Sequence, residues 1–257
     1  MSRIHAAKRA VPMTAVKTGS ILTRRPDNQA SLRKAILRFA QRTLAVIALP
    51  VMTHATSLPA LAQTGGGCIP ASERGAREMG CFVTAREVLE QLPQGLLFWH
   101  LDTYPNRAVA DAAKGPRGTV VESFGKIWLF TIAGAGWRPI GGEHIAEIGP
   151  LPLIEAEHYA ALYMEGVFAP GMASEVHRHP GVEAWYTLAG EMCVETPQGK
   201  SIQRAGDPGV FVAAGLPMEL IGTGTGVRRS LVLILQDASK PPGSLAPDWK
   251  PEGLCRT

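Results

Sequence analysis

Short runs of β-branched and aromatic residues, separated by Gly, Pro and Asn, recur through the C-terminal two thirds of this 257-residue chain. Runs of this length are typical of strands, and many short strands punctuated by turn residues favour an all-β barrel or sandwich. The runs are GLLFWHLDTY, TVVESF, KIWLFTIAG, ALYMEGVFA, EAWYTLAG, EMCVET, GVFVAAG and SLVLILQD. Their tryptophans Trp99 and Trp128, with Trp137 in a following turn, are expected in the core.

Two segments have helical character instead. TAREVLEQLP, residues 84–93, begins with Thr84 and has Glu87 three positions later, which is a capping-box pattern. It predicts one short N-terminal helix. RAVADAAKGP, residues 107–116, predicts a second short helix between strands.

The first 62 residues differ from the rest in charge. They hold ten Lys or Arg and one acid, Asp27, which leaves 16 basic and 21 acidic residues in the remainder. The basic balance of the whole chain therefore does not indicate nucleic-acid binding. Basic residues precede the apolar run at 44–52, and Ala60-Leu61-Ala62 offers a cleavage site, so residues 1–62 are predicted to be a signal peptide with a long basic n-region. We expect a periplasmic or secreted protein without stable membrane insertion after cleavage.

Residues 63–80 are expected to form a flexible leader, residues 81–240 a β-barrel domain, and residues 241–257 a proline-rich tail without regular structure. All four cysteines lie after residue 62, and an even count in an exported chain favours disulfides, although three connectivities are open. Cys68–Cys81 would close a short loop, and Cys193–Cys255 would then tie the tail to the barrel.

The segment SEVHRHPGVEAWYT carries the strongest functional signal. Side chains at i and i+2 of a strand share a face, so His177 and His179 project together. Pro180-Gly181 turns the chain, and Glu183 can return to the same interior, followed by Trp185 and Thr187. Two imidazoles and one carboxylate form a recurrent ligand set for first-row metals that leaves positions open. The alternative is two ordinary histidines on a polar strand.

At these residues the chain resembles the cupin superfamily. Gly171, His177-Arg178-His179, Glu183 and Gly190 match the first cupin motif, and Gly206 to Met218 resembles the second, with Ala213 where proline is usual. The resemblance covers residues 160–237. It implies a cupin-type double-stranded β-helix, a jelly-roll barrel with the metal inside one end; residues 81–159 would add N-terminal strands. It also implies edge-strand dimers, hence a possible homodimer.

Met218 stands where the last motif histidine is expected. Three interpretations are open: three protein ligands plus water at an iron, manganese or zinc ion, a thioether ligand to copper, or a degenerate site in which Met218 fills the core. His100, His144 or His158 could supply a replacement ligand, and Glu165 could face the cavity as an acid or base. Trp185, Thr187 and Met218 are the predicted substrate-pocket residues; no catalytic residue is assigned.

Taken together, these patterns predict an exported cupin-domain metalloprotein that binds one divalent metal ion and a small organic ligand. Oxygen-dependent oxidation is one reaction that the ligand set allows, and isomerisation is another. The alternative is a non-catalytic small-molecule or sugar-binding cupin with a degenerate metal site. Nothing in the sequence resembles a phosphate loop, a Ser/His/Asp triad or a nucleic-acid-stacking surface.

Overall fold

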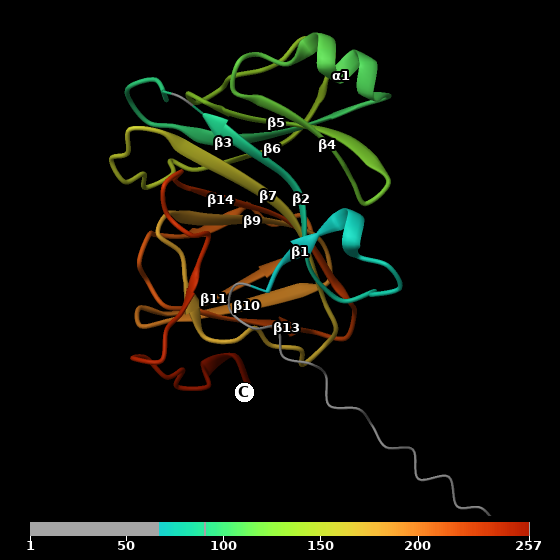
Figure 1. The fold of residues 1–257 in the computed structure, drawn as a ribbon. Coiled ribbons are helices and arrows are strands. Elements are labelled where there is room, and N and C mark those ends of the chain that lie inside the picture. The colour runs from blue at the N-terminus through green and yellow to red at the C-terminus, as the bar shows by residue number, and fades with distance from the viewer. Residues whose placement is uncertain (1–66, 90, 257) are drawn as a thin grey trace, which may run out of the picture. The chain divides into compact units, whose positions relative to one another are not determined.

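The computed structural model describes residues 67–89 and 91–256, and these are almost entirely strands and loops (Figure 1). The predicted signal peptide lies outside the described residues. A six-stranded sheet runs in the order β1 (Ile69–Pro70), β2 (Gly80–Leu89), β7 (Tyr159–Phe168), β14 (Arg228–Asp237), β9 (Val182–Ala189) and β12 (Val210–Val212). Facing it is a three-stranded sheet of β11 (Gly199–Arg204), β10 (Glu191–Thr196) and β13 (Glu219–Thr223).

The order in which the chain visits these two sheets is that of a jelly roll. It passes from β9 to β10 and β11, returns to β12, crosses to β13 and returns to β14. This alternation is the double-stranded β-helix that the motifs imply. A short pair, β8 (His177–Arg178) with β15 (Ser244–Leu245), contains the first motif histidine, and the second directly follows β8.

A further sheet is formed by the segment between β2 and β7. It has the order β4 (Gly118–Ser123), β5 (Lys126–Ala133), β3 (Phe98–Tyr104) and β6 (Glu143–Ile148), and is the green layer in Figure 1. These are the extra N-terminal strands that the sequence predicts. The predicted helix at 107–116 is confirmed as α1 (Arg107–Ala113), where the Asn106 side chain caps the Val109 N–H at 3.0 Å.

Strand alternation divides the core into two clusters on opposite faces of the six-stranded sheet. On β14, Leu231, Leu233 and Leu235 pack with the tryptophans Trp99 and Trp128 of the four-stranded sheet. The intervening Val232 and Ile234 pack with residues of β10 and β13 inside the barrel. Every second residue of β7, β9 and β14 therefore points into the barrel, and the site residues on these strands are among the inward-pointing ones.

The predicted helix at 84–93 is wrong, because residues 80–89 form β2. This strand pairs with β7 from Gly80↔Val167 to Leu89↔Tyr159, interrupted by one bulge near Thr84. The Thr84 hydroxyl donates to the Tyr163 carbonyl oxygen at 3.0 Å rather than capping a helix, and the apolar side chain of Val88 is 56% exposed. A long ladder to a neighbouring strand outweighs the helix propensity of a short Arg-, Glu- and Leu-containing segment.

Both ends of the described chain are more ordered than the sequence predicts. Part of the expected flexible leader forms β1 and the 3₁₀ turn η1 (Ala71–Glu73), and β1 pairs in parallel with β2. The tail, expected to lack regular structure, forms β15 and a second 3₁₀ turn, η2 (Leu254–Arg256). No helix in the described part of the chain is long and apolar enough to span a membrane.

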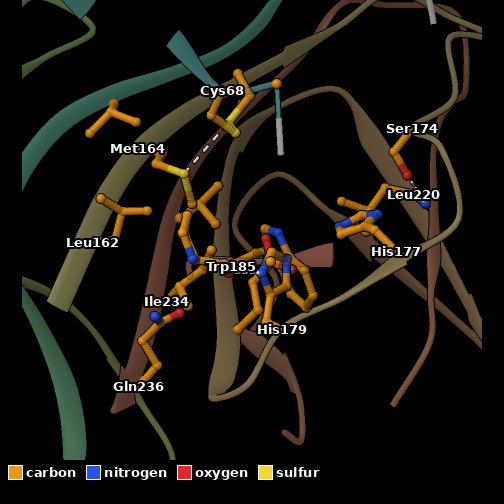
Figure 2. A pocket seen from close by; sticks show the side chains of 18 of the residues that line it. Cys68, Leu162, Met164, Ser174, His177, His179, Trp185, Leu220, Ile234 and Gln236 are labelled. Carbon is orange, nitrogen blue, oxygen red and sulfur yellow. Dashed lines mark hydrogen bonds and ion pairs between the residues drawn. A yellow bond between two sulfur atoms is a disulfide. The ribbon is translucent and has the colours of Figure 1, made fainter. Parts of the chain in front are cut away.

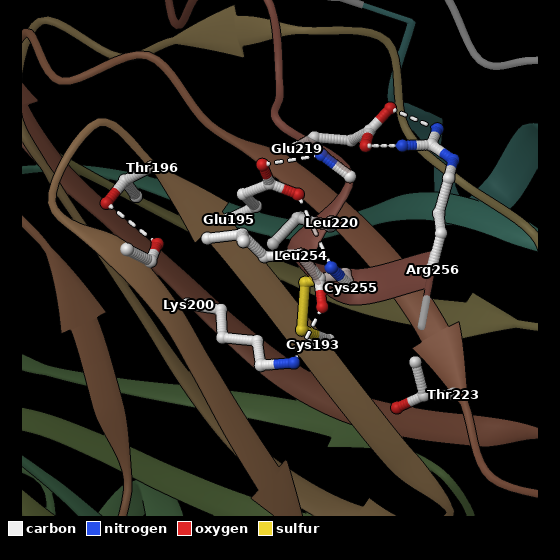
Figure 3. The surroundings of a disulfide bond; sticks show 12 residues. Cys193, Glu195, Thr196, Lys200, Glu219, Leu220, Thr223, Leu254, Cys255 and Arg256 are labelled. Carbon is white, nitrogen blue, oxygen red and sulfur yellow. Dashed lines mark hydrogen bonds and ion pairs between the residues drawn. A yellow bond between two sulfur atoms is a disulfide. The ribbon is translucent and has the colours of Figure 1, made fainter.

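Two disulfides secure these ends, and they are the two pairs that the sequence favours. Cys68–Cys81 joins the segment before β1 to β2, and Cys193–Cys255 joins β10 to η2. Figure 3 shows the second bridge among polar contacts of the tail: the Glu195 carboxylate accepts from the Gly253 N–H at 3.0 Å, and Arg256 makes a two-pronged pair with Glu219 at 2.6 and 2.8 Å. The tail is therefore fixed along the barrel.

Candidate metal centre

The first motif histidine, His177, lies on a very short strand that is held on both sides, and His179 directly follows this strand. Leu245 of β15 pairs with His177 along one edge. On the other edge, the backbones of His177 and Met218 exchange two hydrogen bonds, at 3.1 and 2.8 Å. The imidazole rings consequently project to the same side, with centroids 5.0 Å apart, and each residue is only 9% exposed.

Glu183 reaches the histidines because the chain turns sharply at Pro180-Gly181. A Cβ atom at Gly181 would lie 2.1 Å from the Leu235 carbonyl oxygen, so only glycine fits at this close approach to β14. The turn delivers Glu183 to β9, opposite Ile234, with its carboxylate inside the barrel. One ligand atom from each of His177, His179 and Glu183 lies within 4.8 Å of the other two.

Backbone carbonyl groups fix the tautomer of both imidazoles. His177 Nδ1 lies 2.7 Å from the Glu175 carbonyl oxygen, and His179 Nδ1 lies 2.5 Å from that of Pro242. A carbonyl oxygen only accepts, so each Nδ1 carries a proton and donates it. In the neutral rings the lone pairs are then on Nε2. This is the arrangement by which proteins orient histidines towards a metal ion.

The two facing ligand atoms have no partner beyond each other. His179 Nε2 and Glu183 Oε2 lie 2.9 Å apart, an ion pair when His179 is protonated, and with neutral His179 neither atom has a hydrogen-bond partner among the described residues. Leaving such atoms buried and unsatisfied costs about 1–3 kcal/mol each. A cation that accepts both lone pairs would remove this cost, so the donor set fits a divalent metal ion.

Electrostatics keeps the carboxylate charged. Burial is the largest influence on the pKa of Glu183 and would raise it, but the neighbouring cationic groups, first among them His179, together outweigh burial and lower the pKa. Burial would likewise lower the pKa of His179, but the charge and hydrogen bond of Glu183, with the Pro242 carbonyl group, together outweigh burial and raise it. Burial dominates at His177 and lowers its pKa. The metal-free site thus holds a carboxylate beside a histidine that readily carries a proton, which a metal ion would displace.

A cavity of about 210 Å³ opens next to these side chains. Figure 2 shows His177, His179 and Trp185 on its wall, with Met164 beside the sulfur atoms of the Cys68–Cys81 bridge. Its apolar lining comes from Met164, Phe168, Trp185, Leu220, Val232 and Ile234. The cavity is smaller than the roughly 300–1,000 Å³ of sites for drug-sized ligands. A molecule of few heavy atoms would fit.

The predicted pocket residues have different environments. Trp185 lines the cavity and is fully buried. Thr187 lies deeper, where its hydroxyl donates to Gln203 Oε1 at 2.8 Å and contacts Ser230, and it does not line the cavity. Met218 is also absent from the lining and packs in the barrel core, 1% exposed. This packing agrees with the core-filler interpretation.

None of the other candidate histidines joins the site. His100 is buried on β3 with Nε2 3.0 Å from the Gly134 carbonyl oxygen, His144 pairs with Asp102 at 3.0 Å, and the His158 side chain is 55% exposed. Among the described residues, His177, His179 and Glu183 are the one group of three such side chains close enough to hold a metal.

Glu165 occupies a different part of the molecule from the cavity. Its carboxylate accepts from Arg74 and from the Ser123 hydroxyl, each at 2.8 Å, and from the Phe124 N–H at 3.1 Å. These bonds join β7 to η1 and to the β4–β5 turn. Glu165 is therefore a buried structural carboxylate and does not supply an acid or base to the histidine site.

Two features of the site were not foreseen from the sequence. One is the tail: Pro242 binds His179, and Gly243 packs against its ring. The other is Arg228, a buried cation that lines the cavity. Strand alternation from Ile234 back through Val232 and Ser230 would have placed Arg228 inside the barrel, but its neighbour Arg229 made the pair look like an exposed charged turn.

Comparisons with known proteins give structural matches alone. No protein-family model and no curated protein matches the chain. A cupin superfamily protein from Desulfitobacterium hafniense is similar at 21% identity over 30% of this chain and 68% of its own, with a TM-score of 0.28. A double-stranded β-helix protein from Klebsiella pneumoniae has 17% identity over 34% and 70%, with a TM-score of 0.30.

An oxalate oxidase structure is also similar, at 21% identity over 34% of this chain, with a TM-score of 0.30. The chain spans 46% of that oxidase. Likeness at this level says nothing about the activity of this chain. The chain's own strand order identifies the fold, because β7 and β9 to β14 alternate between two sheets as in a double-stranded β-helix barrel.

Proposed function

We propose that the barrel binds one divalent metal ion through His177, His179 and Glu183 and a small organic ligand in the adjoining cavity. The observation that carries this proposal is the pairing of two Nδ1-anchored imidazoles with a buried carboxylate whose facing atoms have no other partner. Iron(II), manganese(II) and zinc(II) suit such nitrogen and oxygen donors, whereas copper(I) would need the thioether that Met218 keeps in the core.

The favoured activity is oxygen-dependent oxidation of the small ligand. A bound iron(II) ion would supply redox chemistry and open coordination positions. The chain's own residues would orient the ligand: Trp185 forms one wall, and the apolar residues of β7 and β14 exclude water. The test is oxygen consumption by the iron(II)-reconstituted protein with a panel of small organic molecules. Oxygen consumption by the wild-type protein should exceed that of the His177→Ala variant.

The alternative is a non-catalytic binding cupin, and the missing fourth ligand favours it. Met218 does not replace the motif histidine, and no other described histidine does. This alternative predicts ligand binding without turnover under any of the three metals. Failure of the iron(II) form to consume oxygen, together with unchanged ligand on chromatography, would select it.

We also propose export to the periplasm or the medium. The basic and apolar N-terminal pattern and the two disulfides support this location. N-terminal sequencing of the protein recovered outside the cytoplasm should give a start at or near Gln63. A start upstream of Leu44 would contradict signal cleavage.

A further inference from the structure

The cavity beside the histidines has an unusual balance of charge. Its lining includes three cations, Arg86, Arg228 and Lys240, and one carboxylate, Glu183. Arg86 and Lys240 are exposed, whereas Arg228 is 1% exposed. A buried guanidinium is costly unless a partner compensates its charge.

Arg228 lacks such a partner among the described residues. Its Nε and Nη2 atoms are buried and have no hydrogen bond. The guanidinium carbon lies 5.2 Å from the centre of the Phe168 ring, which contributes a modest cation–π attraction. Burial lowers the pKa of Arg228 to about 10, opposed by the charge of Glu183. It remains a cation at neutral pH, and Glu183 is already engaged by the histidines.

With a divalent ion held by neutral histidines and an ionised Glu183, the buried charges of the ion, Glu183 and Arg228 sum to plus two. An anion is therefore what the metal-bound cavity lacks.

We infer that the ligand of this cavity is a small carboxylate with a short apolar body, whose carboxylate is bound by Arg228. The inference rests on the proposed ligand-binding role of the cavity and names its ligand class. A carboxylate matches the planar guanidinium in shape and offers only acceptors. Trp185 Nε1 is a second buried cavity donor without a partner. Apolar side chains from β7 and β14 would surround the carbon chain.

The strand register limits the length of that body. Arg228 Nη1 lies 3.2 Å from the point where a Cβ on Gly166 would stand, and Gly166 is opposite Ser230. Glu183 is opposite Ile234, four residues further along β14. At about 3.3 Å per residue, the two levels are about 13 Å apart. The guanidinium group and the ligated ion occupy part of this distance, and a chain of a few carbon atoms spans the remainder.

The test is calorimetric titration with butyrate, using acetate and sulfate as size and anion controls and butyramide as the uncharged analogue. The protein is titrated both zinc-loaded, because zinc has no redox chemistry, and metal-free. Wild type should bind butyrate more tightly than acetate or sulfate and at least about tenfold more tightly than butyramide. Equal binding of butyrate and butyramide would overturn the inference, as would sulfate binding as tightly as butyrate.

Variants locate the binding group. Arg228→Met should weaken butyrate binding about 30-fold or more, because it removes one member of a buried charge pair. Its matched control is Arg229→Met on the adjacent exposed position, which should leave butyrate affinity unchanged. Gly166→Ala, which crowds Nη1 without removing charge, should also weaken binding, and it serves if Arg228→Met fails to fold. Retained butyrate affinity in both folded variants would refute the assignment.

Metal analysis separates this inference from the proposed function. Arg228→Met should keep the zinc stoichiometry of wild type, since Arg228 is no ligand. If wild type bound no metal but bound butyrate through Arg228, the metal proposal would fail while the carboxylate assignment held. The assignment of Arg228 as the carboxylate-binding residue would be contradicted if Arg229→Met weakened butyrate binding as much as Arg228→Met.

Discussion

The tail's contact with His179 makes Gly243→Ala a specific perturbation of the metal centre. A Cβ at residue 243 would lie 2.9 Å from His179 Nδ1 and 3.0 Å from its Cε1. Ordinary contacts between such atoms are about 3.5–4.0 Å, so the ring and the tail must separate by about 0.5 Å or more. The Nδ1 hydrogen bond to the Pro242 carbonyl oxygen would then be lost or rotated.

The expected loss of zinc affinity follows from the known contribution of hydrogen bonds that orient metal ligands. Removing one typically lowers metal affinity 10–100-fold, or about 1.4–2.8 kcal/mol. The assay is zinc titration of metal-free protein against a chromophoric chelator. Gly226→Ala is the control, because a Cβ there meets nothing within 4 Å and the backbone angle is ordinary. Zinc affinity of Gly243→Ala within twofold of both wild type and control would refute the positioning role of the tail.

Three further predictions test neighbouring parts of the account. Zinc affinity should be highest above the raised pKa of His179 and should fall as the pH drops through that pKa, because zinc must then displace a proton. Below the lowered pKa of His177 the affinity should fall more steeply, since a second proton competes. Chelator competition from pH 8 to 5 measures the affinity, and a flat profile would contradict this prediction. Met218→Ala should cost about 2–5 kcal/mol of stability in denaturant unfolding but leave zinc stoichiometry unchanged; lost metal would instead make the thioether a ligand. Replacing both Cys193 and Cys255 by serine should lower the free energy of unfolding by about 4 kcal/mol, and replacing both Cys68 and Cys81 by about 3 kcal/mol. The difference arises because the bridged cysteines are 62 and 13 positions apart, and the longer loop loses more entropy on closure. The opposite order in urea unfolding would disprove this argument.

The proximity of His177, His179 and Glu183 could be predicted from the sequence because it depends on local geometry. His177 and His179 share a face through strand alternation, and the Pro180-Gly181 turn sets where Glu183 begins its strand. The strand runs likewise indicate an all-β fold, since each run carries its own β-branched and aromatic signal. These features need few long-range contacts to specify them.

The features that sequence reasoning missed all depend on partners distant in the chain. Residues 84–89 have helical propensity, and their strand conformation comes from pairing with β7, at least 70 positions later. The tail becomes ordered because β15 pairs with β8 and because Cys255 is bonded to Cys193. Arg228 looks like part of an exposed basic pair until the register of β14 places it inside the barrel. Local pattern carries no information about these partners.

The central claim is that His177, His179 and Glu183 together bind one divalent metal ion. The most direct measurement is metal content by mass spectrometry after reconstitution with iron(II), manganese(II) or zinc(II) and removal of excess ion, for wild type and for His177→Ala. The structure predicts one ion per chain in wild type for at least one of these metals and none in the variant, with Arg229→Met behaving as wild type. Equal metal content in wild type and His177→Ala would contradict the account.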